Sequence, residues 1–215
     1  MELFQQAIHT ILHIDTYLLS FVSHYGVWTY IALFFIIFCE TGFVITPFLP
    51  GDSLLFTAGS IAANHYSTLS IELLFVTLLI ASILGNKLNY LIGKALGPKI
   101  FMGNRLLFNQ HHLEQTHQFY EKHGGKTIIL ARFIPIIRTF APFVAGMGKM
   151  NMQEFFLYNT ISAVVWIGSL LGAGYFLGSL PIVKENFSIV IYSIIMLTLL
   201  PPLFAFCYRK ASQRL

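Results

Sequence analysis

Four charged residues lie inside the two apolar stretches of this chain that prolines interrupt. Two are carboxylates, Glu40 and Asp52, and two are arginines, Arg132 and Arg138. Each charge at membrane depth costs about 2.5–3.5 kcal/mol on insertion scales, so all four need partners or water. Two guanidinium groups can bind a phosphate through paired hydrogen bonds and stay charged, whereas carboxylates can gain and lose protons. These residue types predict a phosphate-binding site at which Glu40 and Asp52 couple to protons.

A proline between the two arginines allows them to converge. On an unbroken helix Arg132 and Arg138, six residues apart, would point about 120° away from each other. Pro135 lies between them and can break the helix, so that two arms fold back on one another. The alternative interpretation is that the four charges form two structural ion pairs, which hold the breaks together and have no part in transport.

The carboxylates frame the first break in the apolar pattern. The apolar run over 27–63 is longer than the ~20 residues that cross a bilayer once. Three turn formers interrupt it: Pro47, Pro50 and Gly51. We expect a long arm over 27–46 and a short arm over 53–63, which is too short to span. Because irregular backbone survives at this depth only where protein or a polar cavity surrounds it, the pattern predicts a re-entrant hairpin.

A second interrupted stretch and several spans follow. The second hairpin is predicted over 127–148, with turn residues Pro135, Pro142 and Gly146. Membrane spans are predicted over 71–96, 151–178 and 187–207. Tight helix packing is expected at small and aromatic residues, namely Tyr90, Gly93, Gly97, Tyr175 and Gly178. The other segments are an interfacial helix over 1–26, an amphipathic cytoplasmic linker over 98–126 and a basic tail over 208–215.

Composition places the chain among polytopic helical membrane proteins. Of its 215 residues, 56% are hydrophobic and 10% are charged, and the mean hydropathy is +0.71. No Lys or Arg precedes Lys87, so the basic region of a cleaved signal peptide is missing and we expect 1–26 to stay in the mature protein. The basic residues flank apolar spans, which indicates a cytoplasmic linker and C-terminus and contact with anionic lipid, and not nucleic acid.

The histidines and cysteines do not have the spacing of a metal site. His9 and His13 lie one turn apart without a third ligand, and four further histidines are scattered in the linker, where they can sense pH near neutrality. Cys39 and Cys207 lie in apolar segments, which is typical of packing thiols. We therefore expect no metal and no cofactor. A homo-oligomer is compatible with the sequence.

The chain contains an internal repeat. A shift of 85 residues aligns Phe48-Leu49-Pro50 with Phe133-Ile134-Pro135, Tyr90 with Tyr175, and Gly93 with Gly178. Each copy is a hairpin followed by one spanning helix, an odd number of crossings, so the second copy must enter from the opposite side. The predicted fold class is an all-α polytopic membrane protein with an inverted repeat of re-entrant hairpins, repeat 1 over 27–97 and repeat 2 over 127–180.

These motifs resemble those of a known family. Glu40 upstream of Phe48-Leu49-Pro50-Gly51-Asp52, the segment Arg132 to Arg138 followed by Ala145-Gly146, and Tyr90-Leu91-Ile92-Gly93 are similar to motifs of the DedA family. DedA proteins are bacterial inner-membrane proteins related to the VTT-domain (SNARE-associated) lipid scramblases of eukaryotes. The resemblance covers about residues 27–180. The family often has an acidic residue after the glycine at Gly85 and a glycine before the tyrosine, where this chain has Asn86 and Asn89.

The resemblance implies a function as well as a fold. It implies two opposed re-entrant hairpins, dependence on the proton motive force, and translocation of undecaprenyl phosphate back across the membrane for envelope synthesis. It also implies that Glu40, Asp52, Arg132 and Arg138 are the functional charges. The expected partners are therefore a membrane lipid, such as undecaprenyl phosphate, and protons.

Two other classes of function remain open. A proton-coupled exporter of cations or drugs would use the carboxylates and leave the arginines structural. A membrane lipid-phosphate phosphatase would be an enzyme with a histidine nucleophile in a Pro-Ser-Gly-His motif, but this tetrapeptide is absent from the sequence. No histidine lies between Lys126 and Leu215, where the two arginines are. We therefore expect a carrier and not an enzyme.

Overall fold

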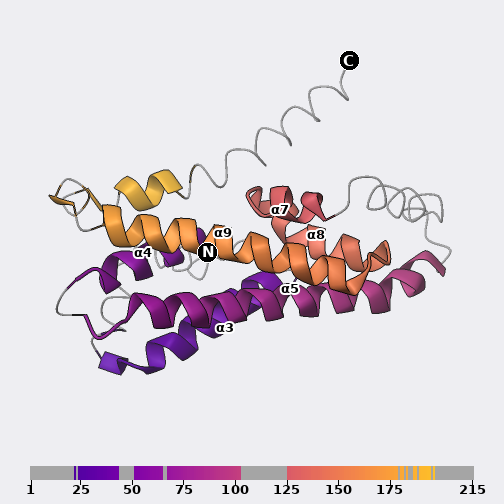
Figure 1. The fold of residues 1–215 in the computed structure, drawn as a ribbon, viewed down its shortest axis with the longest axis horizontal. Helices are drawn as coiled ribbons and strands as arrows, with labels where there is room; N and C mark the ends of the chain where they lie inside the picture. Colours follow the sequence, from indigo (N-terminus) through magenta and orange to yellow (C-terminus); the bar gives the residue numbers. More distant parts are fainter. Residues whose placement is uncertain are drawn as a thin grey trace, which may run out of the picture. The chain divides into compact units, whose positions relative to one another are not determined.

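The computed structural model describes residues 22, 24–43, 51–64, 67–102, 125–178, 180, 181, 183, 186, 187, 189–194 and 196. The described part of the chain is helical and has no strand, which confirms the all-α class. Its helices are α3 (Trp28–Gly42), α4 (Gly51–Ala62), α5 (Ile71–Met102), α7 (Lys126–Ala131), α8 (Pro135–Met147) and α9 (Met152–Leu177) (Figure 1). Most of the predicted interfacial helix, linker and last span, and all of the basic tail, lie outside the described residues.

Within the described residues, two helices are long and apolar enough to cross a membrane. They are Ile71–Leu96 within α5 and Met152–Leu177, with 26 residues each, and they lie where the spans were predicted, over 71–96 and 151–178. Side-chain caps set where each begins. Ser70 Oγ accepts a hydrogen bond from the backbone N–H of Leu73 at 3.3 Å, and Asn151 Oδ1 accepts one from Gln153 at 2.8 Å.

The first interrupted stretch contains two short helices. The first, α3, has 15 residues and ends at Gly42, earlier than the predicted end of the long arm at residue 46. The second, α4, has 12 residues and rises only ~18 Å, less than the ~30 Å of a bilayer's hydrocarbon core. Gly51 is the first residue of α4, whereas Pro47 and Pro50 lie outside the described residues.

The second interrupted stretch is a pair of helices, α7 with six residues and α8 with 13. Pro135 begins α8, where its missing N–H has no intrahelical partner to lose. The prediction that Pro142 and Gly146 form the turn is wrong, because both lie inside α8. Pro142 removes only one backbone hydrogen bond, and the helix continues past it because Ala141 and Ala145 are packed in a buried cluster.

The chain divides into two compact units, which are described separately. Unit 1 comprises Met1–Phe34, Pro50–Leu78 and Ile167–Leu215, and unit 2 comprises Phe35–Leu49 and Leu79–Trp166. Helices α3, α5 and α9 each contribute residues to both units.

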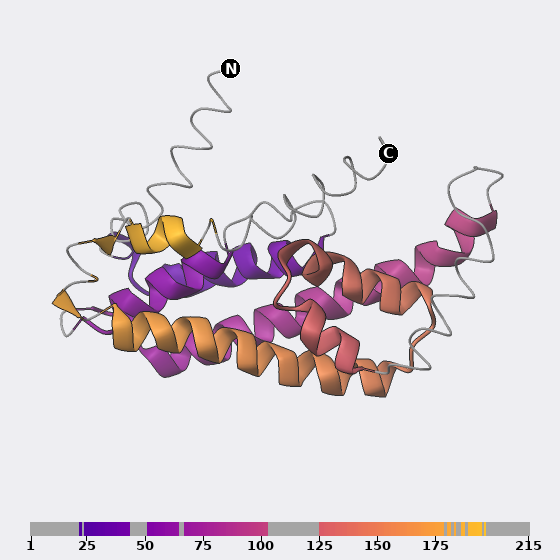
Figure 2. The same cartoon turned by 90° about the horizontal axis from the view of Figure 1, so that it is seen from above.

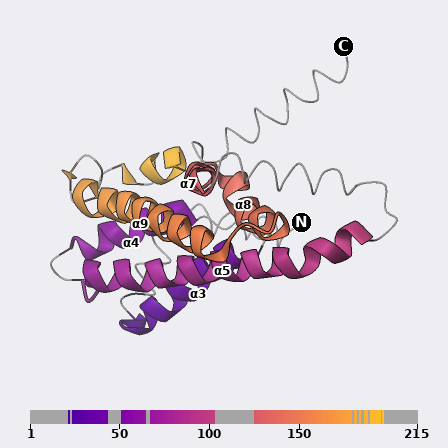
Figure 3. The same ribbon diagram turned by 45° about the vertical axis from the view of Figure 1, so that its right-hand side comes forward.

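In unit 1, α4 packs closely against the C-terminal half of α9 (Figure 3). A Cβ atom added to Gly59 of α4 would collide with the backbone carbonyl of Leu171, and one added to Gly174 of α9 would collide with the carbonyl of Phe56. Gly178 lies against the hydroxyl of Ser60. The two backbones therefore meet through glycines on both sides, as in small-residue packing of membrane helices.

In unit 2, α8 packs in the same way against the C-terminal half of α5 (Figure 2). A Cβ added to Gly146 would collide with the carbonyl of Tyr90, and one added to Gly93 would collide with that of Phe143. Gly93 of unit 2 therefore makes the same kind of contact as Gly174 of unit 1. The 85-residue shift instead aligns Gly93 with Gly178, which lies one helical turn after Gly174. The surroundings of Gly97 lie outside the described residues.

Tyr90 anchors the core of unit 2. Its side chain is 1% exposed, its ring stacks on Phe155 with the centroids 4.5 Å apart, and its hydroxyl donates to the carbonyl of Met150 at 2.5 Å. Tyr175 differs, since its ring is only partly buried and meets Phe176 edge-on at 5.5 Å.

Candidate functional site

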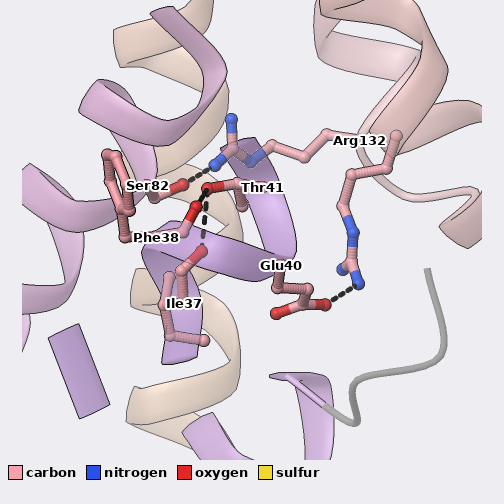
Figure 4. A network of polar contacts seen from close by, with 7 residues as sticks. Ile37, Phe38, Glu40, Thr41, Ser82 and Arg132 are labelled. Carbon is pink, nitrogen blue, oxygen red and sulfur yellow. Dashed lines mark hydrogen bonds and ion pairs between the residues drawn. The ribbon is translucent and has the colours of Figure 1, made fainter. Parts of the chain in front are cut away.

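A buried ion pair joins the two interrupted stretches within unit 2. Arg138, in the first turn of α8, donates from Nη2 to Oε1 of Glu40, near the end of α3, at 2.6 Å (Figure 4). The two side chains are 5% and 1% exposed. Residues 98 apart in the sequence therefore form a charge-assisted hydrogen bond away from water.

Arg132 is held by polar groups of two other helices. It caps the C-terminus of α7, and its side chain is 2% exposed. Its Nη1 donates to Oδ1 of Asn159 at 3.2 Å and to Oγ of Ser162 at 3.1 Å, both on α9. Its Nη2 donates to the hydroxyl of Ser82 on α5 (Figure 4). These bonds position the guanidinium between α5 and α9.

Both guanidinium groups lie over the same indole ring. The Cζ atoms of Arg132 and Arg138 are 5.1 Å and 4.7 Å from the ring centroid of Trp166. Trp166 is itself buried. An arginine within about 6 Å of an aromatic ring gains a cation–π interaction, which is stronger away from water. The convergence of the arginines that Pro135 made possible is present in the structure.

The other buried side chains of this site come from one face of each long helix, α5 and α9. On α5 the lining residues are Ser82, Asn86 and Asn89, and on α9 they are Asn159, Ser162 and Trp166. Each set recurs at three- or four-residue spacing, so its members share a helix face. Asn86 Nδ2 donates to Asn159 Oδ1 at 2.7 Å and joins the two faces.

Asn89 contacts the backbone of both interrupted stretches. Its Nδ2 donates to the carbonyl of Thr41 in α3 at 3.2 Å and to the carbonyl of Thr139 in α8 at 2.8 Å. The side chain is fully buried. Because both partners are carbonyl oxygens, the orientation of this amide is determined by its surroundings.

Three of the four predicted charges thus lie together in unit 2. The fourth, Asp52, belongs to unit 1, where it lies in the first turn of α4 and is partly buried. A carboxylate at this position stabilises the positive end of the helix dipole.

Sequence reasoning missed several residues of this site. The predicted site contained neither Trp166 nor the hydroxyls and amides of the two spans. The signal was available, since these polar residues interrupt apolar spans at helical spacing, and such residues face the protein interior. Among the described residues, no group of three or more His, Cys, Asp or Glu could hold a metal ion. The histidines of the linker lie outside that part of the chain.

Comparison with known proteins places the chain in a family. Residues 49–176 match the VTT domain. The chain is 52% identical over 202 residues to "Protein DedA" of Escherichia coli (strain K12), an alignment that covers 94% of this chain and 92% of that protein. It is 41% identical over 179 residues to an uncharacterized membrane protein of Mycobacterium leprae (strain TN), with 83% and 79% covered.

A third relative is named for its location. The "Inner membrane protein YqjA" of Escherichia coli (strain K12) is 33% identical over 183 residues, which cover 85% of this chain and 82% of that protein. No solved structure matches the chain. The VTT-domain match extends over more than half of the sequence, and it includes Arg132 and Arg138. The chain belongs to the DedA family of membrane proteins, which carry the VTT domain.

Proposed function

We propose that this protein is a translocase, driven by the proton motive force, of undecaprenyl phosphate or a similar polyprenyl phosphate in the bacterial inner membrane. The observation that carries the proposal is the convergence of Arg132 and Arg138 on Trp166, at 5.1 Å and 4.7 Å. Two guanidiniums on one ring can donate to different oxygens of a single phosphate. Arginine suits this role because it stays charged in a low-dielectric site.

Glu40 supplies the link to protons. It accepts from Arg138 at 2.6 Å, so a phosphate oxygen that binds this guanidinium must take the place of the carboxylate. A carboxylate displaced from its arginine in a buried site is stabilised by taking up a proton. Lipid binding and proton uptake are thereby coupled at one residue, and Asp52 is proposed as the second titrating carboxylate.

The architecture we propose is an inverted repeat. The helix pairs α3–α4 and α7–α8 are the two re-entrant hairpins, and each is followed by a spanning helix. The reciprocal glycine contacts of α4 with α9 and of α8 with α5 support this equivalence. In such a carrier the linker and C-terminus lie in the cytoplasm, and the prenyl tail remains in the lipid while the phosphate occupies the site.

Binding of undecaprenyl phosphate to the purified protein tests the proposal. Each charge-assisted hydrogen bond contributes about 1.5–3 kcal/mol, so Arg132→Ala and Arg138→Ala should each weaken binding by roughly tenfold or more. Lys126→Ala removes an exposed positive charge of α7 and serves as the control with unchanged affinity. Equal affinity in the wild type and both arginine variants would exclude a phosphate clamp.

The proposal describes a carrier, so the lipid should leave the protein chemically unchanged. Incubation of undecaprenyl phosphate with the purified protein is expected to release no inorganic phosphate. Release that depends on the protein would instead identify a lipid-phosphate phosphatase, since a carrier forms no covalent or hydrolytic intermediate.

A further inference from the structure

One buried amide, that of Asn89, ties together the two backbone positions that follow the ion pair. Thr41 directly follows Glu40, and Thr139 directly follows Arg138. Asn89 Nδ2 donates to the carbonyls of both threonines, at 3.2 Å and 2.8 Å. Because both carbonyl oxygens accept from the same nitrogen atom, they lie close to each other.

The two carbonyls lie in helix segments that lack some of their backbone hydrogen bonds. Thr41 is in the last turn of α3, where backbone carbonyls have no intrahelical donor. In α8, Pro142 cannot donate to the carbonyl four residues earlier, that of Arg138, so the turn next to Thr139 has lost a backbone bond. Asn89 itself lies in the middle of α5, a long and regular helix, and its side chain is fully buried.

We propose that Asn89 is a positioning residue that holds Glu40 and Arg138 at hydrogen-bond distance. A primary amide has two N–H groups, and here each has its own carbonyl partner. Without this amide, α3 and α8 can separate or slide, and the carboxylate then loses its fixed position relative to the guanidinium. The bearing of this role on lipid binding rests on the proposed function, whereas the geometric role does not.

Asn86 provides a matched comparison on the same helix. It is also an asparagine of α5 and also buried, but its Nδ2 donates to the side chain of Asn159 on α9 at 2.7 Å. It does not bond to the backbone of α3 or α8 in the described contacts. A variant at Asn86 therefore removes a buried amide of equal size without removing the link between Glu40 and Arg138.

The experiment measures whether Glu40 and Arg138 still interact when Asn89 is replaced. Unfolding midpoints in detergent are recorded for Glu40→Gln, Arg138→Gln and the double variant, in the wild-type, Asn89→Leu and Asn86→Leu backgrounds. The shifts of the two single variants should be non-additive in the wild type and in Asn86→Leu, and should become additive in Asn89→Leu. Asn89→Ser, which retains one donor, gives an intermediate result and replaces Asn89→Leu if that variant fails to fold.

Equal non-additivity in the Asn89 variants and in the wild type would overturn the proposal, because an amide that merely fills space lowers all midpoints alike. This measurement contains no lipid, so it is independent of the proposed function. A second arm measures undecaprenyl phosphate binding to Asn89→Leu, where a loss of at least severalfold is expected. If the wild type itself fails to bind the lipid, the proposed function fails and the midpoint result still decides the role of Asn89.

Discussion

The cost of removing both members of the Glu40–Arg138 pair should be well below the sum of the costs of removing each member alone. The two atoms are 2.6 Å apart, and neither side chain is more than 5% exposed. Loss of one partner leaves the other charge buried without it, which typically costs about 3–5 kcal/mol. We therefore expect Glu40→Gln and Arg138→Gln each to lower the free energy of unfolding by this order.

The double variant replaces the ion pair with two neutral amides that can bond to each other. Its cost should be about 2 kcal/mol or more below the sum of the two single variants, as is found for contacting residues. The assay is unfolding of the purified protein in mixed detergent, followed by tryptophan fluorescence. Glu72→Gln, at an exposed carboxylate of unit 1, should combine additively with Arg138→Gln. Additivity of Glu40→Gln with Arg138→Gln to within about 0.5 kcal/mol would refute the buried pair.

Three further predictions concern single positions. Gly146→Ala places a Cβ against the backbone carbonyl of Tyr90 and should lower the free energy of unfolding by about 1–3 kcal/mol. The Cβ of Gly172→Ala meets no atom within 4 Å, so this variant should leave the free energy of unfolding unchanged or raise it by up to about 1 kcal/mol. Unfolding in detergent checks both. Trp166→Leu removes two cation–π contacts of roughly 0.5–1 kcal/mol each and should weaken undecaprenyl phosphate binding about 5- to 30-fold, while Trp166→Phe, which keeps a ring, should weaken it less; unchanged binding in the leucine variant contradicts the role of the indole. Ser70→Ala removes the N-cap of α5 and should cost about 1 kcal/mol of unfolding free energy, so an unchanged midpoint would contradict the cap.

The apolar pattern of the sequence was sufficient to predict the main helices. Apolar runs of span length predicted α9 to within one residue at each end and the start of α5, whereas α5 continues to Met102, beyond the predicted end at residue 96. Pro135 correctly marked the start of α8, since a proline at the first helical position loses no backbone bond. The cost of a lone charge at membrane depth predicted that Glu40 and Arg138 each need a partner or water, and the structure shows that they pair with each other.

Other features depend on contacts that a single sequence does not display. Pro142 and Gly146 have the residue types of a turn, but packing of α8 on α5 keeps both inside a helix. Gly93 aligns with Gly178 by sequence, yet its contact role matches that of Gly174, because helix faces repeat every turn. The hydrogen bonds of Asn89 end on two backbone carbonyls. Every residue has a backbone carbonyl, so the residue types at these two positions do not reveal the contact.

Transport across a membrane tests the central claim most directly. Proteoliposomes with a fluorescent short-chain polyprenyl phosphate in one leaflet would be given a proton gradient, and the movement of the label would be followed by quenching from outside. The account predicts translocation that depends on the gradient and is lost in Arg132→Gln, Arg138→Gln and Glu40→Gln, but not in Lys126→Gln. Translocation at the wild-type rate in both arginine variants would contradict it, and proton-coupled cation export that survives both arginine substitutions but fails in Glu40→Gln would identify an exporter instead.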